Sequence, residues 1–154
     1  MTIYGLQYDT VGTLPFTPAL QAFYYNGRYA HRPYTLGRGR IWIDVTGANP
    51  GQCFWLDVET GDADPTQVPG WIAERGGGGV YCNRSTLPQV LTELNGHFCG
   101  LWLATLDGTT DPAIELPHNV RLLAVQAFPA AMTGINADLS VVVDRTYWDT
   151  RAVM

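Results

Sequence analysis

Hydrophobic residues gather in short runs along the chain, and Gly, Pro, Asn or Asp closes each run. Several runs are almost wholly apolar rather than alternating, among them CFWLDV, GLWLAT and RLLAVQAF. Strands of this kind are buried on both faces, as the strands of a parallel sheet are. The pattern predicts eight strands: Ile3–Asp9, Leu20–Tyr25, Arg40–Val45, Cys53–Glu59, Gly79–Asn83, Gly100–Thr105, Arg121–Phe128 and Asp138–Asp144.

Two helices are predicted between the central strands. The first begins at Pro65, because proline is favoured at a helix start, and ends near Arg75 before a run of four glycines. The second begins after Ser85, a typical N-cap, and ends at Asn95. The other connections are rich in Pro and Gly and look too short for full helices.

The order strand, helix, strand, helix, strand is typical of βαβ units in a parallel sheet. Eight such strands predict an α/β fold, a shortened (β/α)₈ TIM-like barrel in which several helices are reduced or missing. The reason for the shortening is length, because the chain has 154 residues and this barrel usually needs at least about 200. An open parallel sheet is the alternative. Residues 1–154 are expected to form one domain.

Composition narrows the range of partners and compartments. The net charge is −5 and all nine basic residues are arginine, so the backbone of a nucleic acid is not an expected partner. The three cysteines lack paired spacing and are expected to be buried thiols. No apolar run approaches the about 20 residues of a membrane span, and no secretory signal is recognisable at the N-terminus. We therefore expect a protein made in the cytoplasm that does not bind membranes.

The segment WLDVETG, which contains Asp57 and Glu59, is the clearest chemical signal. Because strand side chains alternate between faces, these two acids share one face. They lie at the carboxyl end of a very apolar strand, where parallel α/β folds place their sites. Repulsion and apolar surroundings raise the pKa of such a pair, which suits a general acid acting on a glycosidic oxygen. Alternatively, the acids cap the following turn or pair with an arginine.

Residues on other strands are further candidates for the same site. Each of them alone is more typical of a turn or a core, and only convergence on one barrel mouth would make them functional. These candidates are Asp9, Tyr81, Asn83, Trp102, Gln126 and Asp138. A second, aromatic group offers faces for stacking on sugars, or else forms barrel wall or an interface: Phe23, Tyr24, Tyr25, Tyr29 and Tyr34.

Several segments resemble the Chalaropsis-type lysozymes, which are family 25 glycoside hydrolases, and the related glycoside-hydrolase-like domains of actinobacteria and their phages. WLDVETGDADPTQVPGWI is similar to the fourth-strand motif of that group, an Asp-x-Glu after apolar residues followed by a helix. GGVYCNRSTLPQVL resembles the fifth strand and its helix, GLWLATLDG the sixth strand, LLAVQAF the seventh and INADLSVVVD the eighth. The resemblance extends from about Cys53 to Asp144.

The resemblance implies a barrel that takes peptidoglycan-like glycan at the carboxyl ends of its strands. In that group the Glu of Asp-x-Glu is the proton donor, which maps to Glu59, and its neighbour Asp57 stabilises charge or positions the substrate. An acid ending the first strand maps to Asp9, and the Asp before the last apolar run maps to Asp138. Substrate contacts are then expected from Tyr81, Asn83, Trp102 and Gln126. No metal and no organic cofactor is implied.

Two functions follow from these observations. The first is a small phage-type muramidase that hydrolyses the β-1,4 bonds of peptidoglycan. The second is a catalytically inactive virion component that binds host-surface glycan or other virion proteins on the same barrel. The acid pair favours the first function, whereas the short chain favours the second. The first strand reads GLQYDT where the family has Gly-Ile-Asp-Val-Ser, which bears on the mapping of Asp9. In both cases we expect the protein to be made in the host cytoplasm and to be associated with the virion.

Overall fold

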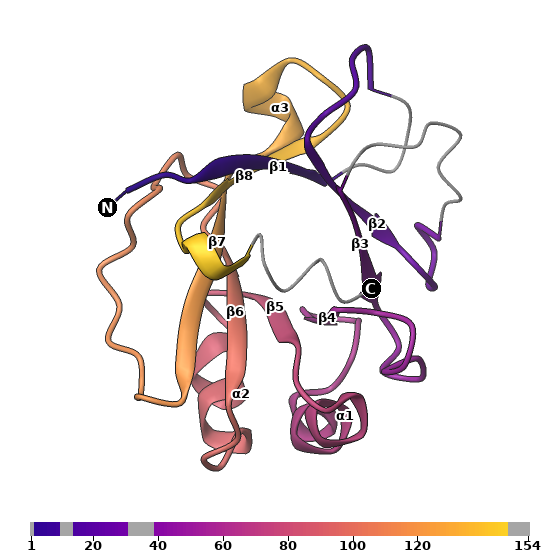
Figure 1. Ribbon diagram of the computed structural model, residues 1–154, viewed down its shortest axis with the longest axis vertical. Helices are drawn as coiled ribbons and strands as arrows, with labels where there is room; N and C mark the ends of the chain where they lie inside the picture. Colours follow the sequence, from indigo (N-terminus) through magenta and orange to yellow (C-terminus); the bar gives the residue numbers. More distant parts are fainter. Residues whose placement is uncertain (1, 10–13, 31–38, 148–154) are drawn as a thin grey trace.

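Eight strands close into one barrel in the computed structural model, which describes residues 2–9, 14–30 and 39–147 (Figure 1). Closure rules out the open sheet. All eight predicted strands are confirmed, and each end lies within two residues of its predicted position. The strands are β1 (Gly5–Asp9), β2 (Leu20–Tyr24), β3 (Gly39–Asp44), β4 (Trp55–Val58), β5 (Gly79–Asn83), β6 (Cys99–Ala104), β7 (Val120–Phe128) and β8 (Asp138–Val142).

The direction of β8 differs from the prediction of a wholly parallel sheet. Strands β1 to β7 pair in parallel with their sequence neighbours, whereas β8 is antiparallel to both β7 and β1. The connection from β7 to β8 explains this, because residues 129–137 are too few for the crossover of a dozen or more residues that a parallel pair needs. The chain turns back instead, so the amino end of β8 meets the carboxyl ends of the other strands.

Helices cover only part of the barrel, as the shortened fold predicts. A 3₁₀ turn, η1 (Pro65–Gln67), leads into α1 (Val68–Arg75), and α2 (Leu87–Glu93) follows β5. Figure 1 shows α1 and α2 together outside the β4–β6 side, whereas the short α3 (Ala130–Thr133) lies at the opposite side near β8. Among the described residues, no helix combines the length and apolar character that a membrane span requires.

The residues at the helix ends agree with the sequence prediction, with one exception. Asp64 and Gln67 form a capping box at η1, and Gly76 ends α1 with a φ of 78°, in the left-handed region that suits glycine. The prediction that Ser85 caps α2 is wrong, because the N-cap is Thr86. Instead the Asn83 side chain, at the end of β5, accepts hydrogen bonds from the backbone N–H groups of Ser85 and Thr86.

Alternation along the strands separates an inner core from an outer one. Trp55, Tyr81 and Trp102 lie inside the barrel, with the Tyr81 and Trp102 rings 4.6 Å apart. Their sequence neighbours, such as Leu56 and Leu101, pack outward beneath α1 and α2. All three cysteines are free and buried, as predicted, and burial raises the pKa of the Cys53 and Cys99 thiols to about 12.

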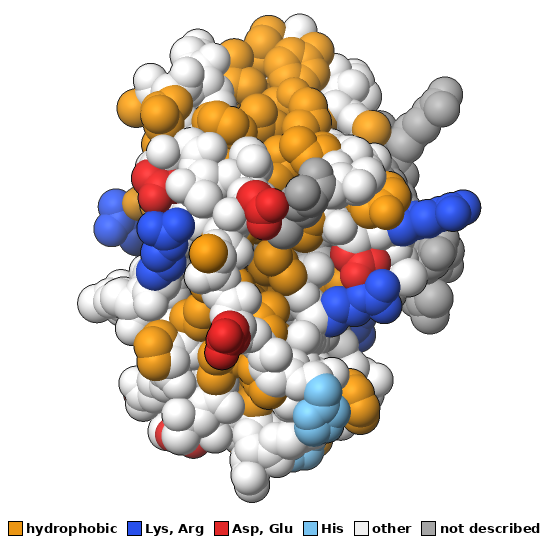
Figure 2. All heavy atoms as spheres, turned by 90° about the vertical axis from the view of Figure 1, so that its left-hand side faces the viewer, with side chains coloured by type: hydrophobic (Ala, Val, Ile, Leu, Met, Phe, Trp, Pro, Cys, Tyr) orange, Lys and Arg blue, Asp and Glu red, His pale blue; other side chains and the backbone are white. Residues whose placement is uncertain are grey.

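The outer face of β1 and β8 is apolar and partly exposed. Leu6 on β1 is 43% exposed and Met132 on α3 is 60% exposed. Between these elements lies a hollow of about 310 Å³ lined by Tyr8, Phe16, Phe128, Met132, Thr133, Ile135 and Leu139. Apolar side chains dominate the upper part of the molecule in Figure 2, which views the side at the left of Figure 1.

Candidate active site at the barrel mouth

One end of the barrel gathers most of the predicted site residues. The carboxyl ends of β1 to β7 meet the amino end of β8 there, and Asp9 pairs in register with Asp138 across β1 and β8. We call this end the mouth and define it by its polar side chains: Asp9, Tyr24, Asp57, Glu59, Asn83, Gln126 and Asp138. In parallel barrels this is the end at which active sites are found.

Asp57 and Glu59 share one face, as the strand spacing predicts. An oxygen of one carboxyl lies within 4.8 Å of an oxygen of the other, and among the described residues neither carboxyl is paired with an arginine. Asp57 is only 3% exposed, and burial together with the charge of Glu59 raises its pKa well above the ordinary value. Glu59 is half-buried at the rim, so a ligand in the mouth can reach it.

Glu59 is positioned by the next strand. The Asn83 side chain donates a hydrogen bond of 3.1 Å from Nδ2 to Glu59 Oε1. Burial raises the pKa of Glu59 above 4.5, the charges of Asp62 and Asp138 add to this, and the hydrogen bond from Asn83 opposes it. Asn83 thus both holds the carboxyl of Glu59 and starts the turn into α2, which explains the position of this asparagine at the end of β5.

Asp9 is, like Asp57, a deeply buried carboxyl of the mouth. It is 4% exposed, its Oδ2 accepts a hydrogen bond of 2.7 Å from the Tyr24 hydroxyl, and its Oδ1 has no hydrogen-bond partner among the described residues. Burial raises the pKa of Asp9 to about 7, and the charges of Asp138 and Glu59 act in the same direction. The neutral acid and the carboxylate are therefore both populated near neutral pH.

Gln126 links two carboxyls of the mouth to Tyr81 beneath them. Its Nε2 donates to Asp9 Oδ2 at 3.4 Å and to Asp138 Oδ2 at 3.3 Å, while its Oε1 accepts the Tyr81 hydroxyl at 2.6 Å. Gln126 is fully buried, so it lies behind the carboxyls rather than at the opening. Asp138 is half-buried, its Oδ1 accepts the backbone N–H of Ala130, and burial raises its pKa.

Tyr81 and Trp102 form the floor beneath these polar groups. Tyr81 is 3% exposed, and Trp102 is fully buried with its Nε1 donating to Ser140 Oγ at 2.9 Å. The structure therefore brings all eight predicted residues to the mouth or its floor. Substrate contact by Tyr81, Asn83, Trp102 and Gln126 remains a prediction, and the two most deeply buried, Trp102 and Gln126, are placed to support the other side chains.

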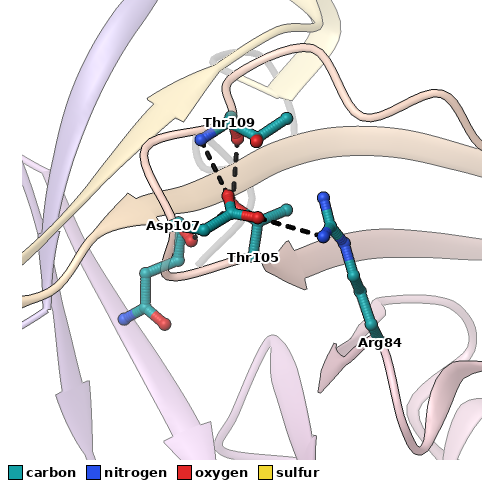
Figure 3. Close-up of polar contacts among 5 residues, drawn as sticks. Arg84, Thr105, Asp107 and Thr109 are labelled. Atoms are coloured by element: carbon teal, nitrogen blue, oxygen red, sulfur yellow. Dashed lines mark hydrogen bonds and ion pairs between the residues drawn. The ribbon is translucent and has the colours of Figure 1, made fainter.

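An ion pair braces the rim beside Asn83. Arg84 Nη1, just after β5, lies 3.0 Å from Asp107 Oδ2 in the loop after β6 (Figure 3). The same Asp107 accepts the backbone N–H of Thr109, and the Thr105 hydroxyl donates to the Thr109 carbonyl. These contacts connect two loops at the mouth, although the pair itself is exposed and contributes little stability.

Two residues near the mouth were not singled out for a role there by the sequence. Tyr24, one of the aromatic group, points into the barrel toward Asp9, whereas Phe23 is a buried wall residue and Tyr34 lies outside the described residues. Asp62 was not predicted at all. It lies in the turn after β4, where an oxygen of its carboxylate approaches those of Asp57 and Glu59 within 4.8 Å. The segment DVETGD, in which Asp62 follows the acid pair after a short turn, was the sequence signal that could have indicated it.

Asp44, at the end of β3, has a different role. It is fully buried and faces α1, where its Oδ2 accepts Trp71 Nε1 at 2.9 Å and the backbone N–H of Asn49. Its Oδ1 accepts Asn26 Nδ2 and the backbone N–H groups of Thr46 and Gly47. Burial alone would raise the pKa of Asp44, but these hydrogen bonds outweigh it and lower the pKa. Asp44 anchors loops and α1.

Another hollow lies at the other end of the barrel. It measures about 490 Å³ and is lined by Phe54, Gly77, Gly78, Phe98, Cys99, Gly100, His118, Asn119, Arg121, Leu123 and Thr146. None of these side chains is a carboxylate, so acid chemistry of the glycosidase kind has no donor there. The mouth remains the stronger candidate because it holds the titrating groups.

Comparisons with known proteins found no matching family model, no similar curated protein and no similar solved structure.

Proposed function

We propose that this protein is a muramidase-type glycoside hydrolase of an actinobacterial phage, built on a shortened (β/α)₈-type barrel and acting on peptidoglycan glycan. The observation that supports it most is Glu59, a half-buried carboxyl with a raised pKa beside a second acid at the strand ends. A general acid must still hold its proton at the working pH and must be reachable by the substrate. The raised pKa of Glu59 favours the first condition, and its partial exposure favours the second.

The other acids divide the remaining tasks. Glu59 protonates the leaving oxygen, and Asp57, whose buried carboxyl has a strongly raised pKa, positions a substrate group or a water. An oxygen of one carboxyl lies within 4.8 Å of an oxygen of the other, so both acids can reach one glycosidic bond. Asp9 and Asp138, linked by Gln126, add further carboxyls to the sugar-facing side.

A second candidate is an inactive virion component that binds host glycan or other virion proteins. The exposed apolar face of β1, β8 and α3 favours it, because a large apolar patch is typical of a surface that packs against another protein. In an inactive virion component, the acids of the mouth are present but the protein does not hydrolyse glycan.

The test compares the wild type with Glu59→Gln in a zymogram and a turbidity assay on actinobacterial cell walls. We expect clearing by the wild type and a loss of at least about 100-fold in the variant, the typical contribution of a general acid. Glu115→Gln, an exposed acid in the loop between β6 and β7, is the matched control and should clear normally. Circular dichroism and thermal melting verify that both variants fold.

The outcomes separate the two candidates. Equal clearing by the wild type and Glu59→Gln contradicts the assignment of the proton donor. Absence of clearing by the wild type, combined with sedimentation of the protein on cell walls, favours glycan binding without catalysis. Absence of both clearing and sedimentation favours a part that contacts only other virion proteins.

A further inference from the structure

The turn after β4 brings a third acid to the pair at the mouth. The backbone N–H of Asp62 donates to the Glu59 carbonyl at 3.1 Å, and the N–H of Ala63 donates to the Asp57 carbonyl at 3.1 Å. The chain therefore folds back over the end of β4. One carboxylate oxygen from each of Asp57, Glu59 and Asp62 lies within 4.8 Å of the others.

Asp57 carries an unsatisfied polar atom within this cluster. Its Oδ1 is buried and has no hydrogen-bond partner among the described residues, and the side chain is only 3% exposed. A buried carboxylate oxygen without a donor is costly, and native structures normally supply a partner. A donor or a cation beside Asp57 would supply this partner.

We propose that Asp57, Glu59 and Asp62 bind one divalent cation of the size of calcium. Hard cations take oxygen ligands, and carboxylates are the ones they prefer. Calcium binds its ligands at about 2.3–2.6 Å, so oxygens on opposite sides of one ion lie up to about 4.6–5.2 Å apart. Three oxygens within 4.8 Å of one another fit around such an ion. Magnesium, at about 2.0–2.1 Å, requires a tighter set.

The charges around the cluster favour a cation. Asp9 and Asp138 lie in the same mouth, and the charges of both acids act on carboxyls of the mouth. Opposing them, the charge of Arg28 acts on Asp62 and lowers its pKa, although burial raises that pKa more. A dipositive ion between three carboxylates relieves their mutual repulsion, so the field of the mouth attracts it.

The consequence for activity rests on the proposed function. An ion held by Glu59 occupies the carboxylate that has to carry the proton, so calcium inhibits hydrolysis competitively with the glycan. Asp62 then acts as a regulatory ligand, because it binds the ion and takes no part in proton transfer.

Isothermal titration of the full chain with CaCl₂ in chelator-treated buffer at pH 8, without glycan, tests the site. We expect one ion per chain with a Kd of about 10⁻⁴–10⁻³ M, and weaker binding of MgCl₂. Asp62→Asn should weaken calcium binding at least about tenfold, because affinity follows the charge of the ligands. Glu115→Gln removes one exposed charge elsewhere and should leave the affinity unchanged.

The ion site and the hydrolase can fail separately. Absence of saturable calcium binding, or equal affinity in the wild type and Asp62→Asn, overturns the ion site even if cell walls are cleared. If calcium binding depends on Asp62 but no wall preparation is cleared, the ion site is supported and the proposed hydrolase function is contradicted. Asp62 is exposed, so its variant is expected to fold, and thermal melting verifies this.

Discussion

Replacing Asp9 by Asn should stabilise the protein at high pH. Burial raises the pKa of Asp9 from 3.8 to about 7, while the same side chain in the unfolded chain ionises near 3.8. The unfolded state therefore gains stability by ionisation as the pH rises from 3.8 to 7, and the folded state does not. Each pKa unit is worth about 1.36 kcal/mol, so Asp9 costs about 4 kcal/mol of folding free energy above pH 7, and none below pH 3.8.

The local hydrogen bonds allow Asn to imitate the neutral acid. Asp9 Oδ2 accepts both the Tyr24 hydroxyl and Gln126 Nε2, and an Asn carbonyl oxygen in that place keeps both bonds. The amide NH₂ then occupies the place of Oδ1, which has no partner among the described residues. The steric and hydrogen-bonding cost of the substitution is therefore the same at every pH, and only the ionisation penalty changes.

Urea denaturation followed by tryptophan fluorescence at pH 4 and pH 8 measures the effect. Relative to the wild type, the free energy of unfolding of Asp9→Asn should rise by about 2–4 kcal/mol between the two pH values. Asp107→Asn, an exposed acid whose pKa is lowered by its contacts to Thr109, is the control and should show no such gain. A change below about 1 kcal/mol for Asp9→Asn, or one of opposite sign, would refute the assignment of Asp9 as a buried acid with a raised pKa.

Two further variants test the groups that hold carboxyls in place. Asp44→Asn turns the acceptor of Trp71 and of the Asn49 amide into a donor, which should cost about 2–6 kcal/mol in urea denaturation at pH 7. Because the pKa of Asp44 is lowered on folding, the stability advantage of the wild type over Asp44→Asn should shrink as the pH falls below 3.8. A difference in unfolding free energy that stays constant with pH would contradict the lowered pKa. Tyr24→Phe removes a hydrogen bond that lowers the pKa of Asp9, so a carboxyl NMR titration should place that pKa above 7. If the midpoint of the Asp9 titration is unchanged in Tyr24→Phe, the hydrogen bond from Tyr24 does not lower the pKa of Asp9.

Strand positions were predictable because they depend on local composition. Apolar runs closed by Gly, Pro, Asn or Asp gave all eight strands, and a period of two placed Asp57 and Glu59 on one face. The N-cap of α2 was missed, because Ser85 has the right chemistry but its neighbour Asn83 supplies the acceptor from the end of β5. Whether Ser85 or Asn83 supplies the acceptor depends on where β5 ends, and the local sequence pattern does not show this.

Roles within the mouth were harder to predict because they depend on distant partners. Asp9 and Gln126 are 117 residues apart, and only closure of the barrel brings them into hydrogen-bond range. Tyr24 has the same sequence context as its aromatic neighbours and differs from them by pointing inward to Asp9. Asp44 ends a strand as Asp9 does, but it faces α1 and serves as an anchor.

Local sequence patterns were enough to place the strands, the residues at their ends and the pairs that share a face, because alternation and turn chemistry act over a few residues. Tertiary structure alone decided that β8 runs against its neighbours, since a short connection left no room for a crossover. It also decided which carboxyls lose their water. The raised pKa values at the mouth follow from that burial and from the repulsion between acids that different strands carry to one end of a closed barrel.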